Sequence, residues 1–184
     1  MKFKNEVIKN IYLRRSIRKY SDKTVPKKII NELLKAAVMA PSAMNTQPWN
    51  FSIVSGQEKV RHFAKLAYKE YDLIGKLIWH GFTITHESIF YSAPLLIIIS
   101  GKKGYEWLKE DTNLAVENMF LAAKSLGVGS CWIGFGMVLG KSKQARKELG
   151  IPDNFDISAV LIFGYPLKDK KIIPKREPKI LKWL

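Results

Sequence analysis

The sequence contains a single cysteine, Cys131, in 184 residues. A lone cysteine excludes an intrachain disulfide and any zinc site built from several cysteines. The longest strictly apolar run, residues 93–99, is far shorter than the roughly 20 residues that span a bilayer, so it predicts a buried strand. The charged amino terminus has no apolar segment behind it, which argues against a secretory signal. We therefore expect a cytoplasmic protein that does not cross a membrane.

Side chains that commonly perform catalysis are also scarce. His62, His80 and His86 lack the spacing of a metal-binding pair, so we expect ordinary surface or partly buried histidines. Cys131 lies in an apolar segment, which favours a small buried side chain over a nucleophile. No pair of carboxylates is apparent. If the chain is an enzyme, we expect no metal and no catalytic side chain, because a bound cofactor would perform the chemistry.

Acidic residues are outnumbered by basic ones, which gives a formal net charge of +15. Nucleic-acid-binding proteins are often this basic, because neutralising backbone phosphates supplies much of their affinity. Here the lysines are spread from Lys2 to Lys182, without a long run or a recognisable nucleic-acid-binding motif. We therefore do not expect nucleic acid as the primary partner. Two explanations stay open: a lysine-biased surface, or a positive field that attracts small anionic ligands such as nucleotides.

The length and the hydrophobic pattern indicate one domain over residues 1–184. A chain of this length supports one hydrophobic core but not two ordinary ones. Periodicity predicts helices at residues 4–14, 24–40, 58–82, 110–126 and 141–149, and strands at residues 49–54, 95–100, 130–133 and 157–163. Helices before, between and after a few strands, without an internal repeat, make this an α+β chain.

Residues 167–184 form a basic, proline-punctuated carboxyl-terminal extension. Its apolar residues are Ile172, Ile173, Ile180, Leu181 and Trp183. A monomer rarely leaves such residues exposed to water. We therefore expect the extension to pack on a second copy of the chain.

Two glycine-containing segments resemble nucleotide-binding motifs but have the wrong spacing. Residues 136–142 end like a phosphate-binding P-loop, yet the first glycine of that motif would fall on Phe135. Gly127-Val-Gly129 begins like a dinucleotide-binding turn, yet the third glycine would fall on Trp132. The sequence therefore predicts neither of these motifs.

Arginine is rare among the 31 basic residues, yet Arg14, Arg15 and Arg18 lie together. Arginine presents a rigid fork of donors that matches phosphate or carboxylate, whereas lysine is a compact point charge. With the hydroxyl of Ser16, this cluster is suited to a phosphate monoester or diphosphate. A solvated helix end is the plain alternative.

Two later segments have side chains or backbone suited to a planar ligand. Residues 41–49 provide amide and hydroxyl groups that could bond the polar edge of a heteroaromatic ring. Residues 129–134 provide an apolar surface with exposed backbone amides. The plain alternatives are a polar loop and a buried strand with a bend.

Taken together and in this order, these segments resemble the nitroreductase family of FMN-dependent oxidoreductases. The similarity rests on RRSIR at residues 14–18, APSAMNTQPW at 40–49, LGVGSCWIG at 126–134 and GYP at 164–166. It extends from about Ile8 to Arg176. The resemblance implies a nitroreductase-like α+β fold with a central, mostly antiparallel sheet flanked by helices. It also implies an intertwined homodimer in which both chains bind two FMN molecules at the interface.

The resemblance assigns cofactor-binding roles to four segments. The first binds the FMN phosphate and the pyrimidine edge of the ring, and the second usually comes from the partner chain. The third lies against the isoalloxazine near its N5 atom, and a late basic pair, whose spacing matches the family more loosely, completes the phosphate pocket. The corresponding residues here are Arg14, Arg15, Ser16 and Arg18; Pro41, Ser42, Asn45 and Gln47; Ile133 and Gly134; and Lys175 and Arg176.

The implied reaction is a ping-pong transfer of hydride from NADH or NADPH, through flavin N5, to an electrophilic small-molecule acceptor such as a nitroaromatic or a quinone. The residues alone also allow a flavin-binding carrier or sensor without turnover, and charge alone allows a nucleic-acid-binding protein. No motif identifies the acceptor or the preferred nicotinamide. The region 68–91, where substrate-covering helices often lie in the family, contains no motif that we recognise.

Overall fold

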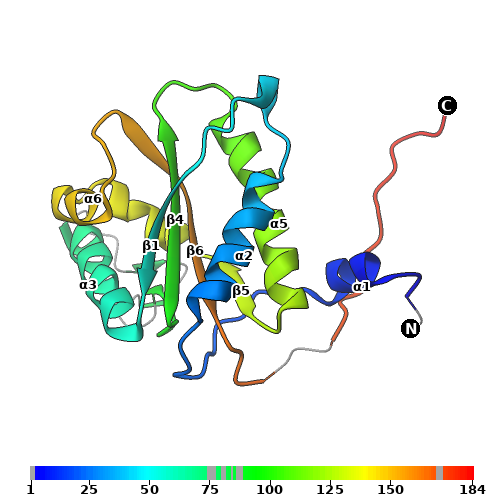
Figure 1. The fold of residues 1–184 in the computed structure, drawn as a ribbon, viewed down its shortest axis with the longest axis horizontal. Coiled ribbons are helices and arrows are strands. Elements are labelled where there is room, and N and C mark those ends of the chain that lie inside the picture. Colours follow the sequence, from blue (N-terminus) through cyan, green and yellow to red (C-terminus); the bar gives the residue numbers. More distant parts are fainter. Residues whose placement is uncertain (1–2, 74–77, 80–81, 84, 86–88, 169–171) are drawn as a thin grey trace.

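The computed structural model describes residues 3–73, 78–79, 82–83, 85, 89–168 and 172–184. Figure 1 shows a central sheet between two layers of helices. The first helix and the carboxyl-terminal extension lie to one side of this body. The histidines at positions 80 and 86, which we expected to be ordinary, lie outside the described residues.

The sheet that forms the centre of the molecule is antiparallel, with strand order β1-β4-β6-β5. Its strands are β1 (Asn50–Ser55), β4 (Leu95–Lys102), β5 (Gly129–Trp132) and β6 (Phe155–Gly164). β4 lies in the interior, with Leu95 opposite Phe163 of β6. Residues 95–101 are all buried, which explains the continuously apolar sequence of this strand. The four predicted strands and the antiparallel arrangement are confirmed.

Helices cover both faces of the sheet. On one face lie α2 (Lys27–Val38) and α5 (Leu108–Ser125), and on the other lie α3 (Gln57–Leu73), the 3-10 helix η2 (Gly134–Gly140) and α6 (Lys143–Leu149). Leu95, Ile97 and Ile99 pack under the first layer, whereas Leu96 and Ile98 pack under the second. This alternation follows from the two-residue period of a strand and places one hydrophobic core on each side of the sheet.

The ends of the helices follow signals in the sequence. α1 (Glu6–Leu13) begins after Asn5, whose side-chain oxygen accepts a hydrogen bond from the N–H of Ile8 at 2.9 Å. It ends at Arg14, so the arginine segment begins where the helix stops. Pro26 precedes α2, and Gly127, with a φ of 72°, follows the end of α5. The long helix therefore ends where the sequence predicted, whereas the helix predicted from residue 24 begins only at Lys27, after Pro26.

The helix predicted over residues 58–82 is too long. α3 ends at Leu73, and the chain then forms two short antiparallel strands, β2 (Ile78–Trp79) and β3 (Phe82–Thr83). Trp79 lies opposite Phe82 in this pairing. Aromatic and β-branched residues favour strands, so this cluster forms a two-stranded pairing instead of a further helical turn.

Large apolar side chains remain exposed at α1 and in the carboxyl-terminal extension. None of the residues of α1 is buried, and Val7 is 64% exposed. Residues 172–184 form no helix or strand, and Figure 1 shows this segment leading away from the body. Leu181 is fully exposed and Trp183 is 83% exposed. Packing of this extension on a second copy stays a prediction.

Candidate functional site

The arginine segment, residues 14–18, lies along the outer edge of β5, which is the last strand of the sheet. Ser16 pairs with Ser130 in a parallel bridge, and the N–H of Ile17 donates to the carbonyl of Ser130 at 2.9 Å. Ile17 is buried and lies so close to Gly129 that a Cβ at that glycine would stand 2.8 Å from its side chain. This close approach requires glycine at position 129 and fixes the arginine segment against the sheet.

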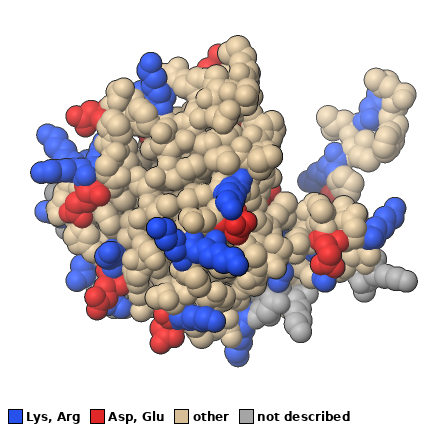
Figure 2. All heavy atoms as spheres, viewed as in Figure 1, with Lys and Arg blue, Asp and Glu red and all other residues tan. Residues whose placement is uncertain are grey.

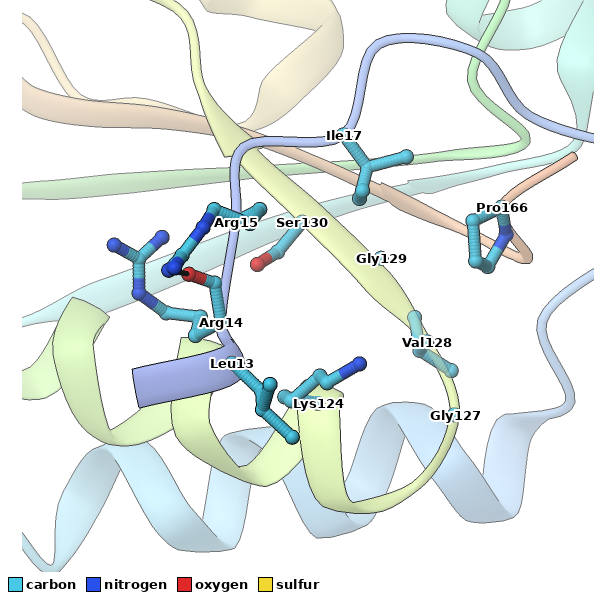
Figure 3. A pocket seen from close by; sticks show the side chains of 10 residues that line it. All are labelled: Leu13, Arg14, Arg15, Ile17, Lys124, Gly127, Val128, Gly129, Ser130 and Pro166. Atoms are coloured by element: carbon cyan, nitrogen blue, oxygen red, sulfur yellow. Dashed lines mark hydrogen bonds between the residues drawn. The ribbon is translucent and has the colours of Figure 1, made fainter. Parts of the chain in front are cut away.

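A cavity of about 190 Å³ opens between this segment and the start of β5. It is lined by Leu13, Arg14, Arg15, Ile17, Lys124, Gly127, Val128, Gly129, Ser130 and Pro166. Figure 3 shows the guanidinium groups of Arg14 and Arg15 on the same side of β5 as the hydroxyl of Ser130. Lys124 and Ser130 were not predicted as site residues. The only sequence signal for Lys124 is its place in the last turn of α5, just before the segment LGVGSCWIG at residues 126–134.

Arg14 and Arg15 are held by different partners. The Nε of Arg14 lies 3.3 Å from a carboxylate oxygen of Glu117, and its guanidinium lies 5.8 Å from the ring centre of Phe120. The Nε of Arg15 donates to the carbonyl of Ile172 at 3.0 Å, which ties the carboxyl-terminal extension to the cavity. Both guanidinium groups are thus oriented at the cavity edge before any ligand binds.

The electrostatics of the cluster favour an anion. The pKa of Arg15 lies below its ordinary value, first because burial removes water from its guanidinium, and then because Arg176 and Arg14 add positive charge nearby. Arg176, predicted from the late basic pair, therefore lies close to the arginine segment. Lys175 is instead exposed and lies 3.5 Å from Glu177. An anion at this cavity would offset the repulsion among the arginines.

Arg18, the last predicted residue of the arginine segment, does not line the cavity. It is exposed, and its guanidinium lies 5.8 Å from the ring centre of Tyr91. The buried Ile17 separates it along the chain from Arg15. The structure therefore does not bring Arg18 into the cavity with the first two arginines.

The residues predicted around position 134 lie at the other end of β5. Ile133 is buried, and its N–H donates to the carbonyl of Val160 at 2.8 Å. Gly134 is exposed, and no atom lies within 4 Å of the place where a Cβ would stand. The backbone at Gly134 is therefore open to a planar group. At about 3.3 Å per residue, Gly134 lies about 13 Å along the chain from Ser130.

The polar loop 41–47 contains the 3-10 helix η1 (Ala43–Asn45) and is mostly exposed. Asn45 and Gln47 adopt left-handed backbone conformations, with φ of 54° and 48°. The Nε2 of Gln47 donates to Oδ1 of Asn45 at 3.2 Å, and its backbone N–H donates to the hydroxyl of Ser42 at 2.9 Å. Pro41 is exposed and begins the loop. These amides therefore face solvent and not another part of the chain.

The loop and the arginine cavity lie at opposite ends of α5. The N–H of Ala43 donates to Asp111 in the first turn of α5, whereas Lys124 of the cavity lies in the last turn. At about 1.5 Å per residue, these two positions are about 20 Å apart along the helix. Figure 1 shows the loop at one end of α5 and α1, which leads into the arginines, near the other. One chain therefore brings the arginines and β5 together, but not the loop.

Cys131 and His62, to which the sequence assigned no role, lie where it predicted. Cys131 is buried, and His62 is a surface residue whose Nε2 lies 2.7 Å from Glu148. Within the part of the chain that the structure describes, no group of three potential metal ligands occurs. No helix among the described residues is both long and apolar enough to cross a membrane.

The chain is similar to known proteins along most of its length. The family model described as the Nitroreductase family matches residues 11–165. A relative in Archaeoglobus fulgidus, named "Putative NADH dehydrogenase/NAD(P)H nitroreductase", is 36% identical over 169 residues, covering 90% of this chain and 88% of the relative. The chain therefore belongs to the nitroreductase family, as its motifs predicted.

Solved structures confirm the predicted fold. The crystal structure of a nitroreductase with bound FMN from Bacteroides fragilis has a TM-score of 0.77 and 29% identity, covering 98% of both chains. An FMN-dependent nitroreductase from Clostridium difficile has a TM-score of 0.81 and 24% identity, covering 98% of this chain and 100% of its own. At that identity, the second structure supports the fold alone.

Proposed function

We propose that the protein is an FMN-dependent oxidoreductase that takes electrons from NADH or NADPH. The observation that carries the proposal is that Arg14, Arg15 and Lys124 line one cavity beside β5, with the charge of Arg176 acting on Arg15. Clustered guanidinium groups are suited to a phosphate monoester, which is the charged end of FMN. The bound FMN of the Bacteroides fragilis nitroreductase and the name of the Archaeoglobus fulgidus relative support the choice of cofactor and electron donor.

The residues present fit FMN in two parts. The cavity of about 190 Å³ is smaller than the roughly 300 Å³ and upward of a whole ligand site, so it suits the phosphate end alone. Arg14 and Arg15 would donate charge-assisted hydrogen bonds to the phosphate, with Arg176, Lys175 and Ser16 completing this end. The open backbone at Gly134, with the buried Ile133 before it, would lie against the flavin ring.

When bound, FMN would supply hydride transfer from the nicotinamide to an electrophilic small molecule, such as a nitroaromatic or a quinone, in a ping-pong reaction. The chain's own residues would bind and orient the cofactor. Its cationic side chains, Arg18 among them, would favour negative charge on the bound ring. No side chain is assigned to proton transfer, in agreement with the scarcity of catalytic residues in the sequence.

A homodimer would complete the site. Pro41, Ser42, Asn45 and Gln47 lie at the far end of α5, so they would reach the flavin held by a partner chain. The surface around that loop is apolar: Val38 is 42% exposed, Met39 79% and Met44 87%. Figure 2 shows a broad area without charged side chains over the upper part of this face. A second copy would cover this area, and the extension 167–184 would pack on that copy.

The test is anaerobic reduction of the FMN-loaded protein by NADH and by NADPH, followed by reoxidation with a panel of nitroaromatics and quinones. We expect the flavin absorbance to bleach within the time of one turnover and to recover when an acceptor is added. A protein that binds FMN but is not reduced by either nicotinamide would instead be a carrier or sensor. A colourless protein that cannot take up FMN would overturn the proposal.

A further inference from the structure

Asp111, in the first turn of α5, is a buried carboxylate that the sequence did not mark as functional. It is 3% exposed. Its Oδ1 accepts a hydrogen bond from the backbone N–H of Ala43 at 3.0 Å, and its Oδ2 accepts one from the hydroxyl of Tyr105 at 3.0 Å. A buried carboxylate is costly unless such donors surround it, and the amino-terminal end of a helix further stabilises its charge.

Tyr105 connects this carboxylate to the opposite side of the loop. Its hydroxyl lies 2.5 Å from the hydroxyl of Thr46. Because Tyr105 donates its own proton to Asp111, the hydroxyl of Thr46 is the donor in this contact. The loop residues 43–46 are therefore tied at both ends to one pair of side chains, Asp111 and Tyr105. Apart from η1, no regular structure supports the loop.

The loop needs such support because its backbone is strained. Met44, Asn45 and Gln47 have φ of 51°, 54° and 48°, in the left-handed region that residues other than glycine seldom adopt. Such conformations are unfavourable and persist only where the surroundings enforce them. The strained residues include Asn45 and Gln47, whose amides face solvent. The hydrogen bonds of Asp111 and Tyr105 thus maintain a loop shape that displays two amide groups.

We propose that Asp111 and Tyr105 are positioning residues that hold Asn45 and Gln47 ready to bind the flavin of the partner chain. This inference rests on the proposed function and extends it to two residues that touch no cofactor. Asp111 acts through the backbone of Ala43, and Tyr105 acts through Thr46. Removing either side chain would release the loop into other conformations, and part of the binding energy for FMN would be spent on ordering it again.

The experiment measures FMN dissociation constants and unfolding free energies for Asp111→Ala, Asp111→Asn and Tyr105→Phe. We expect Asp111→Ala to weaken FMN by about 10- to 100-fold and Tyr105→Phe by about fivefold. Asp111→Asn should be intermediate, because its amide oxygen can still accept from Ala43. The matched control is Thr112→Val, on the same helix, which removes a buried hydroxyl that lies 3.0 Å from the hydroxyl of Ser158 in β6. It should lose stability and keep the wild-type FMN affinity.

A double-mutant cycle separates positioning from general destabilisation. If Asp111 acts through Asn45, then adding Asp111→Ala to Asn45→Ala should weaken FMN much less than Asp111→Ala does in the wild-type chain. Equal effects in both backgrounds, or an Asp111→Ala variant no weaker than Thr112→Val, would overturn the inference. If Asp111→Ala does not fold, unchanged FMN affinity in Tyr105→Phe would overturn it instead. A wild-type protein that does not bind FMN would refute the proposed function before this comparison begins.

Discussion

The two ends of α5 differ in how their functional groups are prepared. At the amino-terminal end, the hydroxyl of Tyr105 donates a hydrogen bond to Asp111, and hydrogen bonds from this pair hold an exposed polar loop in place. At the carboxyl-terminal end, Lys124 lines a cavity together with Arg14 and Arg15, and Arg14 pairs with Glu117. The groups at the first end are hydrogen-bonded within the chain, whereas the second end gathers cations that an anion would stabilise.

This difference fits our proposal that one chain carries two unlike halves of a site. The halves are about 20 Å apart along α5, so they would not meet on one small ligand within a chain. A twofold arrangement of two chains can bring the cationic half of each next to the polar half of the other. The following predictions test the two halves, beginning with the largest expected effect.

Removing the charge of the cationic half should abolish most of the FMN affinity. The double variant Arg14→Gln/Arg15→Gln loses charge-assisted hydrogen bonds at both positions, and we expect FMN to bind about 10²- to 10⁴-fold more weakly. Fluorescence titration of the apoprotein with FMN measures this change. Arg61→Gln, at an exposed arginine of α3, is the control and should bind FMN normally. Equal affinities in the double variant and the control would refute the phosphate assignment.

Mixing variants of the two halves should restore part of the binding. We expect neither Arg14→Gln/Arg15→Gln nor Asn45→Ala/Gln47→Ala to retain FMN alone. After unfolding and refolding together, half of the dimers should be mixed, and each would contain one intact site. FMN occupancy should therefore recover to about a quarter of the wild-type value. No recovery, despite mixed dimers detected by mass spectrometry, would mean that each chain builds its site alone.

Glycine substitutions at the two ends of β5 should separate folding from binding. Gly129→Ala would place a Cβ 2.8 Å from Ile17, and we expect it to lower the unfolding free energy by about 1–3 kcal/mol. Gly134→Ala meets no atom within 4 Å, so its stability should change by no more than about 0.5 kcal/mol. Its FMN affinity should nevertheless fall by about tenfold, because the methyl group would occupy space beside the ring. Denaturant unfolding and FMN titration measure the two quantities, and normal FMN binding by Gly134→Ala would contradict the ring assignment.

The smallest effect concerns pH and Tyr20, whose hydroxyl donates to the carbonyl of Ile17 beneath the arginine segment. Burial raises the pKa of this phenol above its ordinary value of 10.0, with Cys131 adding to the rise and Arg18 opposing it. A raised folded-state pKa means that the contribution to stability is complete below pH 10 and is lost as the pH rises toward the folded-state pKa. Between about pH 9 and pH 11, the wild-type protein should lose about 1 kcal/mol more stability than Tyr20→Phe. Denaturant unfolding at each pH measures this difference. If the unfolding free energies of the wild-type protein and of Tyr20→Phe change in parallel with pH, the prediction is wrong.

Much of the fold could be predicted because its signals are local. The continuous apolar run of β4 and the glycine after α5 each have one favourable structural interpretation. The segment 58–82 was harder, because the aromatic residue at position 79 suits a helix or a strand until its pairing with position 82 is known. Such pairing depends on a partner strand and not on periodicity.

The site could be predicted only where residues form a motif. Arg14, Arg15 and Gly134 were assigned from the sequence because they occur in recognisable segments. Lys124 and Asp111 were not assigned, because only packing places them beside residues distant in the sequence. A single lysine or aspartate on a helix has no sequence signal that separates it from a solvated surface charge.

The hydrogen bond from Arg15 to the carbonyl of Ile172 has a thermodynamic consequence. It makes the same side chain a contact of the carboxyl-terminal extension and a wall of the anion cavity. If the extension packs on a second copy, occupancy of the cavity and assembly of the dimer become linked equilibria. Reciprocity then requires that FMN strengthens dimer formation by the same factor by which dimer formation strengthens FMN binding. The affinity of the protein for its cofactor would therefore depend on the concentration of the protein itself.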